Sequence, residues 1–103
     1  MRLSQKEISA LLTSFKSHLQ TIPYEVSLFG SRTDDHKRGG DIDLLLKVAP
    51  EHFEYVRSIK VILKFDLEEA VGDQRVDLTI ATEETLKNDI FLQSISPELV
   101  KLR

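Results

Sequence analysis

The feature that most constrains the fold is a run of apolar residues that follows two aspartates. Segment 41–48 (DIDLLLKV) contains three consecutive leucines, Leu44–Leu46. Successive residues of a strand point to opposite faces, so a strand with this run is apolar on both of its faces. Such a strand is typical of the centre of a sheet that is covered on both sides. The segment therefore predicts a central strand with helices packed on each face.

Two other segments predict strands. Residues 24–29 (YEVSLF) and 75–80 (RVDLTI) alternate between apolar and polar residues and are rich in strand formers. The connection from segment 41–48 to segment 75–80 is long enough to carry a helix. These two strands are therefore expected to be parallel neighbours or to be separated by one position. The tail, residues 98–103, is expected to form a short helix or an edge strand.

Three segments have helical spacing of apolar residues and recognisable helix ends. Ser and Glu three residues apart make a capping box, Pro suits a helix start, and Gly suits a helix end. The expected helices run from the Ser4–Glu7 box to a point before Pro23, from Pro50 to about Ala70 with Gly72 as the C-cap, and from the Thr82 cap through Glu83 to about Ser94. The predicted fold class is therefore α/β (α+β), a small mixed β-sheet flanked by helices.

The composition limits the class of protein. A chain of 103 residues with 41% hydrophobic residues fits one globular domain, residues 1–103. Without cysteine it has no disulfide framework, no thiolate nucleophile and no cysteine-bound metal. Its net charge of −3 argues against direct nucleic-acid binding. Neither a signal-peptide start nor an apolar run of membrane-spanning length is present, so we expect a cytoplasmic protein with no membrane partner.

Three of the four glycines lie between positions 30 and 40. Gly30 and Ser31 directly follow the strand of residues 24–29. Backbone N–H groups at this turn, together with the Ser31 hydroxyl, are suited to cradling phosphate oxygens. The alternative is an ordinary turn that ends the strand.

Two aspartates, Asp41 and Asp43, open the central strand. Residues i and i+2 of a strand share a face, so both carboxylates can converge on one cation. Mg²⁺ prefers such oxygen ligands, together with water and substrate phosphates. The alternative is a solvated strand end beside basic residues such as Lys37 and Arg38.

A third aspartate, Asp77, lies inside the strand of residues 75–80. A carboxylate within a core strand is costly unless a partner or a metal neutralises it. If the two strands are neighbours, Asp77 can join Asp41 and Asp43 in one acidic cluster. The alternative is a surface ion pair, for example between Arg75 and Asp77.

Gly30-Ser31 facing three aspartates suggests metal-assisted nucleotidyl transfer, in which two metals clamp the attacking and leaving oxygens. In this hypothesis Asp41 and Asp43 hold both metals. Asp77 binds one metal and helps to deprotonate the acceptor hydroxyl.

The same residues carry a family resemblance. Segments 29–32 (FGSR) and 40–44 (GDIDL) resemble the signature of the minimal nucleotidyltransferases of the polymerase-β-like superfamily, and segment 76–78 (VDL) resembles their third-carboxylate strand. The resemblance implies the polymerase-β-like nucleotidyltransferase fold, ATP as substrate and two Mg²⁺ ions. It places Gly30, Ser31 and Arg32 at the triphosphate, and Asp41, Asp43 and Asp77 at the metals.

The resemblance also implies a partner. Many family members are antitoxins paired with a helical HEPN-type toxin, and some transfer AMP from ATP to a tyrosine of that toxin. This chain departs from the family at two points: nine residues, 32–40, separate Gly30-Ser31 from the Asp41-x-Asp43 pair instead of ten, and Gly40 stands where serine is usual.

Three functions therefore remain open. The first is AMP transfer to a hydroxyl of a partner protein. The second is a non-catalytic antitoxin that neutralises its partner by steric contact, which the shortened loop favours. The third is transfer to a small molecule such as an aminoglycoside. Relatives with that activity carry additional helical substrate domains, for which 103 residues leave no room, so we expect a partner to supply the acceptor.

Overall fold

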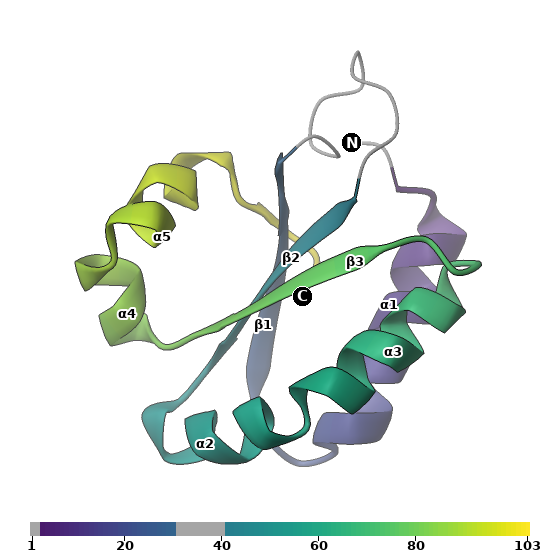
Figure 1. Ribbon diagram of the computed structural model, residues 1–103, viewed down its shortest axis with the longest axis horizontal. Helices are drawn as coiled ribbons and strands as arrows, with labels where there is room; N and C mark the ends of the chain where they lie inside the picture. Colours follow the sequence, from purple (N-terminus) through teal and green to yellow (C-terminus); the bar gives the residue numbers. More distant parts are fainter. Residues whose placement is uncertain (1–2, 31–40) are drawn as a thin grey trace.

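Four strands form one mixed sheet in the computed structural model, which describes residues 3–30 and 41–103. The strands are β1 (Tyr24–Phe29), β2 (Ile42–Val48), β3 (Val76–Ala81) and β4 (Val100–Lys101), in the order β3-β2-β1-β4 (Figure 1). β1 is antiparallel to β2 and to β4, whereas β2 and β3 are parallel neighbours. The predicted mixed sheet is thus confirmed, and the tail supplies an edge strand.

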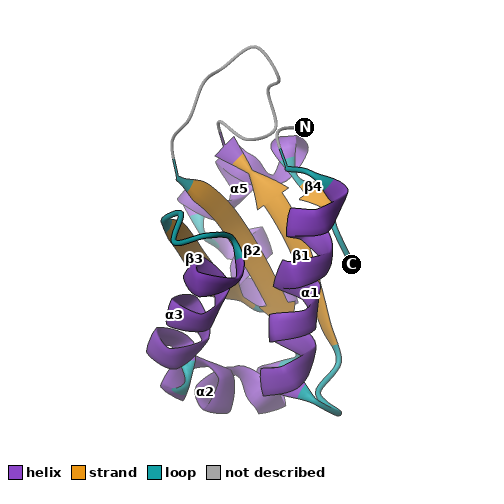
Figure 2. Cartoon of the chain, turned by 90° about the vertical axis from the view of Figure 1, so that its right-hand side faces the viewer, coloured by secondary structure: helices purple, strands orange, loops and turns teal. Residues whose placement is uncertain are grey.

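Helices cover both sides of the sheet. Figures 1 and 2 show α1 and α3 on one side, which we call the first face, and α4 and α5 on the other, the second face. The helices are α1 (Gln5–Leu19), α2 (Pro50–Ser58), α3 (Lys60–Ala70), α4 (Glu83–Asn88), α5 (Ile90–Ile95) and the 3₁₀ helix η2 (Ser96–Glu98). In the described part of the chain, none of them combines the length and the apolar character needed to cross a membrane.

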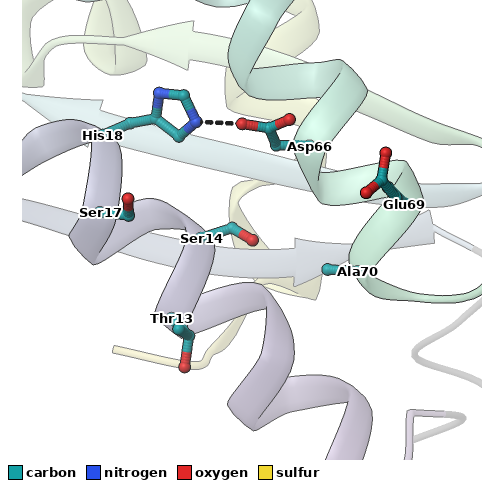
Figure 3. Close-up of a pocket in the computed structure, with 7 residues that line it drawn as sticks. All are labelled: Thr13, Ser14, Ser17, His18, Asp66, Glu69 and Ala70. Atoms are coloured by element: carbon teal, nitrogen blue, oxygen red, sulfur yellow. Dashed lines mark hydrogen bonds and ion pairs between the residues drawn. The ribbon is translucent and has the colours of Figure 1, made fainter.

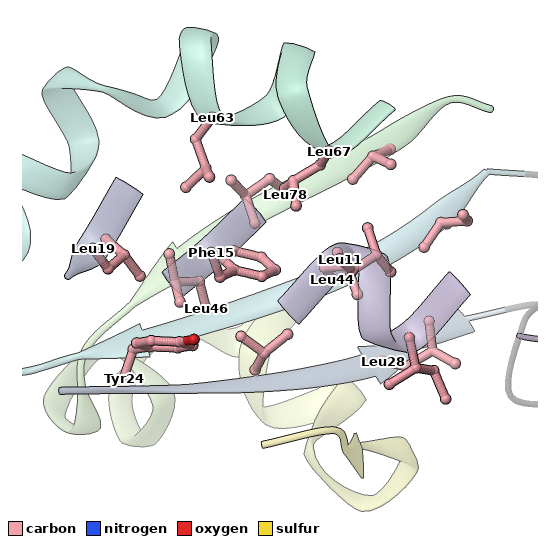
Figure 4. Close-up of a cluster of buried hydrophobic side chains, with 14 of the residues drawn as sticks. Leu11, Phe15, Leu19, Tyr24, Leu28, Leu44, Leu46, Leu63, Leu67 and Leu78 are labelled. Atoms are coloured by element: carbon pink, nitrogen blue, oxygen red, sulfur yellow. The ribbon is translucent and has the colours of Figure 1, made fainter. Parts of the chain in front are cut away.

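The central strand β2 is buried on both faces, as its sequence predicts. Leu44 and Leu46 pack in the larger core, against residues of α1 and α3 such as Phe15 and Leu67 (Figure 4). Leu45 points the other way into a smaller cluster. All three leucines are at most 2% exposed. One strand therefore joins two apolar layers.

The helix starts are largely those that the sequence predicts. At α1, the Ser4 hydroxyl accepts the Glu7 backbone N–H at 3.0 Å, and the Glu7 carboxylate accepts the Ser4 N–H at 2.9 Å. At α4, the Thr82 hydroxyl accepts the Thr85 N–H at 3.2 Å. These bonds satisfy N–H groups that have no partner within the helix.

Two of the three predicted helices are each divided. The helix expected over residues 50–70 breaks at Ile59, whose backbone (φ −100°, ψ 7°) leaves the α region and donates to the Val56 carbonyl in a tighter turn. The helix expected from residue 83 to about 94 breaks at Asp89, which is extended. The Asp89 carboxylate accepts the Leu92 N–H at 3.1 Å and so starts a new helix, because a helix cap competes with continuation of the helix.

Charged side chains connect three strands on the second face. The Glu25 carboxylate on β1 lies 2.6 Å from the Lys47 ammonium on β2 and 2.7 Å from the Lys101 ammonium on β4. The hydrogen bonds from Lys101 and Lys47 lower the pKa of Glu25 to about 2. These ion pairs attach the two-residue edge strand β4 to the sheet.

Glu25→Gln tests this cluster through its pH dependence. The folded pKa is depressed, so the stabilisation is present at neutral pH and is lost as the pH falls from about 4.5 to about 2. The groups are partly exposed, so we expect the variant to lose only about 1 kcal/mol at pH 7. Urea unfolding at a series of pH values measures this difference, which should be mostly lost once the pH has fallen to about 2. A difference that stays constant with pH would contradict the assignment.

Candidate functional site

Two of the three aspartates are direct neighbours in the sheet. Asp43 on β2 is in register with Asp77 on the parallel strand β3. The residues that flank them along both strands, such as Leu44 and Leu78, are buried in the core beneath α1 and α3. Both carboxylates therefore project from the second face. Asp41 immediately precedes β2, which begins one residue later than predicted.

The backbone of Gly30 lies against the Asp43 side chain. Gly30 follows β1, and its neighbour Phe29 pairs with Asp43 across the two strands. A Cβ atom at position 30 would overlap a carboxylate oxygen of Asp43. Gly30 also has a φ of +79°, a conformation that side chains other than glycine rarely adopt. The positive φ therefore favours glycine here, and a Cβ at this position would also force the Asp43 carboxylate to move.

The carboxylates influence one another electrostatically. Partial burial raises the pKa of Asp43, and the negative charges of Asp77 and Asp41 raise it further. All three aspartates thus lie within electrostatic reach of one centre, and a cation there would relieve the repulsion between them. Asp41 is also 3.7 Å from the Arg75 guanidinium, whereas the sequence suggested Asp77 as the partner of Arg75.

The predicted burial of Asp77 was wrong. The sequence places this carboxylate within a core strand, where its charge would be costly. In the structure β3 is an edge strand, and Asp77 is exposed. Its ionised form therefore needs no metal to offset burial. The support for Asp77 as a site residue is therefore its position opposite Asp43, which the strand register determines.

The residues fit Mg²⁺ by donor type. Mg²⁺ in proteins is usually held by one or two carboxylates, with water and substrate phosphates completing the octahedron. Asp43 and Asp77, with Asp41 nearby, offer this donor set. Over residues 3–30 and 41–103, however, no three His, Asp or Glu side chains form a preassembled metal-holding group. The predicted phosphate-binding residues Ser31 and Arg32 lie outside the described residues.

A polar pocket that the sequence did not indicate lies between α1 and α3, away from the aspartates. Within it, His18 Nε2 lies 2.5 Å from Asp66 Oδ2 (Figure 3). The cavity measures about 340 Å³ and is lined by Thr13, Ser14, Ser17, His18, Asp66, Glu69 and Ala70. Because α1 and α3 cover the first face, this pocket is separate from the carboxylates.

A further residue near the aspartates was also missed. Phe91 on α5 is 55% exposed. Its ring centroid lies 6.3 Å from that of Phe29, the cross-strand partner of Asp43. Sequence periodicity gives no signal for this position, because α5 is only six residues long.

Gly30→Ala and Gly72→Ala form a matched pair of variants. Both glycines have positive φ, but a Cβ at Gly72 has no atom within 4 Å. We expect Gly72→Ala to cost about 1 kcal/mol of unfolding free energy from backbone strain alone. Gly30→Ala should cost about 1 kcal/mol more, because the half-buried Asp43 side chain would have to leave its rotamer.

Urea unfolding measures both values. Adding Asp43→Ala should recover part of the Gly30→Ala loss, since it removes the overlapping carboxylate. Equal losses for the two glycine variants would show that the Asp43 side chain does not hinder a Cβ atom at position 30.

Comparison with known proteins does not identify a family for this chain. No model of a known protein family matches the chain, and no curated protein sequence is significantly similar to it. The family resemblance therefore rests on the motif residues themselves, of which Gly30, Asp41, Asp43 and Asp77 lie within the described structure.

Proposed function

We propose that this protein is a Mg²⁺-dependent nucleotidyltransferase that moves AMP from ATP to a tyrosine hydroxyl of a partner protein. The observation that carries the proposal is the register of Asp43 with Asp77, with the Gly30 backbone against Asp43. The proposal includes a fold of the polymerase-β-like type. It also includes a cytoplasmic HEPN-type toxin as the partner. On this view the protein is the antitoxin of that pair.

Asp41 and Asp43 would hold two Mg²⁺ ions, and Asp77 would share one of them. When bound, the ions neutralise the phosphate charge and polarise the α-phosphate. Asp43 is half-buried and fixed on the central strand, which suits a positioning ligand. Asp77 is exposed on the edge strand, which suits contact with an acceptor that arrives from solvent.

In the transfer step, the acceptor oxygen forms a bond to the α-phosphorus as the bond to the diphosphate breaks. The acceptor proton passes to the Asp77 carboxylate, and diphosphate leaves. Gly30 has no side chain to block the approach of phosphates toward the carboxylates. Ser31 and Arg32 remain predicted contacts of the triphosphate.

Asp43→Asn and Asp77→Asn test the proposed site. Each should reduce label transfer from α-labelled ATP to the co-expressed product of the adjacent gene by at least about 100-fold, because a ligand or a proton acceptor is lost. Asp66→Asn is the control, since Asp66 lies in the pocket between α1 and α3.

Circular dichroism should show an unchanged fold in all three variants. Transfer at the wild-type rate by either site variant would refute the catalytic assignment.

A second candidate is a non-catalytic module that neutralises its partner by contact. One observation favours it: four large apolar side chains on α2 and α3 are 53–79% exposed, namely Tyr55, Val61, Ile62 and Phe65. We call them the α2–α3 patch. Val61 and Phe65 are one helical turn apart on α3, and exposed apolar side chains on one helix face are typical of protein-interaction sites.

Phe65→Asp tests the second candidate. Under the second function it should weaken capture of the co-expressed neighbour at least about 10-fold, because a charge would enter an apolar contact, whereas Asp43→Asn should leave capture intact. Ile90→Asp is the matched control, since Ile90 is 84% exposed on α5. Pull-down with purified proteins gives the readout. Equal capture by Phe65→Asp and wild type would count against this function.

A further inference from the structure

Helix α5 exposes apolar side chains that its packing does not require. Leu92 and Ile95 are buried and attach the helix to the sheet, whereas Ile90 is 84% and Phe91 is 55% exposed. A surface helix normally directs its apolar side chains toward the core and polar ones outward. Packing of α5 against the sheet therefore does not explain why the outer part of the Phe91 ring is apolar.

Contact with Phe29 holds the Phe91 ring in place. The two rings meet edge to face, with an interplanar angle of 71° and centroids 6.3 Å apart. This is a favourable geometry for an aromatic pair. Phe29 is itself nearly covered, with 7% exposure. Phe91 is thus oriented along one edge while more than half of its surface stays open.

The aromatic pair continues directly into the acidic site. Phe29 lies opposite Asp43 in the β1–β2 ladder and projects from the same face. Side chains in such pairs have Cβ atoms about 5 Å apart. Figure 1 shows α5 beside the end of β1 from which Gly30 follows. Phe91, Phe29 and Asp43 therefore form a continuous path, and only one side chain separates the exposed ring from the carboxylates.

The size of this apolar surface indicates what would cover it. A standard protein interface uses about 20–30 residues on each side, whereas Ile90 and Phe91 are only two. A single open ring matches one nucleobase, because every base has a flat face that stacks on an aromatic side chain. A base is also uncharged, so it tolerates the neighbouring carboxylates.

We propose that Phe91 stacks on the nucleobase of the nucleotide whose phosphates bind beside Asp43 and Asp77. This inference rests on the nucleotidyltransferase function proposed above. It assigns to α5 the recognition of the base and to the strand ends the recognition of the phosphates. Since any base can stack, the contact adds affinity without selecting adenine.

Isothermal titration with Mg²⁺–ATP and with Mg²⁺–tripolyphosphate separates the two ends of the nucleotide. Phe91→Ala should weaken ATP binding about 10-fold or more and leave tripolyphosphate binding unchanged, because only ATP carries a base. Phe91→Tyr keeps the ring and should retain the affinity for ATP. Phe65→Ala is the matched control, since Phe65 is 65% exposed on α3, and it should bind both ligands as wild type does.

Each other outcome overturns the inference in a distinguishable way. If Phe91→Ala binds ATP as tightly as wild type, the stacking contact is refuted and the proposed function stands. Equal weakening toward ATP and tripolyphosphate would show that Phe91 supports the site without contacting a base. If wild type binds neither ligand, the proposed function fails, and the inference fails with it.

Discussion

The rest of the structure depends on the burial of β2 on both of its faces. Leu44 and Leu46 belong to the core beneath α1 and α3, and Leu45 belongs to the cluster beneath α5. Changing the register by one residue would exchange these sets and move Asp43 into the larger core, at a high desolvation cost. The leucine run therefore fixes the face on which Asp43 lies. Through the parallel ladder it also fixes Asp77 beside it.

Much of this arrangement follows from local sequence rules. The leucine run, the alternation in segment 24–29 and the Ser4–Glu7 box predicted the central strand, its neighbour and the first helix start. Local rules could not distinguish parallel neighbours from separated strands, because the connecting segment allows both. They also could not place β3 at an edge, and so they misjudged the burial of Asp77.

The two helix breaks differ in how far the local sequence could have predicted them. At Asp89 a signal was present, since aspartate before an apolar segment is a preferred N-cap. At Ile59 no glycine or proline marks the break, and the adjacent Ser58 does not cap α3, because its hydroxyl donates to the Tyr55 carbonyl. The exposure of Phe91, like the break at Ile59, has no signal in the local sequence, because only tertiary packing decides which side of a short helix is covered. Residues that depend on long-range packing were thus the ones that sequence reasoning missed.

The two faces of the sheet separate the candidate functions in space. Asp43 and Asp77 project from the second face, while the α2–α3 patch lies on helices of which α3 packs against the first face. A partner seated on that patch would leave the carboxylates open, so its acceptor hydroxyl would have to reach them on a separate segment. Docking and transfer would then be separable by mutation, and loss of one would not argue against the other. Neutralisation by contact and nucleotidyl transfer are therefore compatible properties of one small domain.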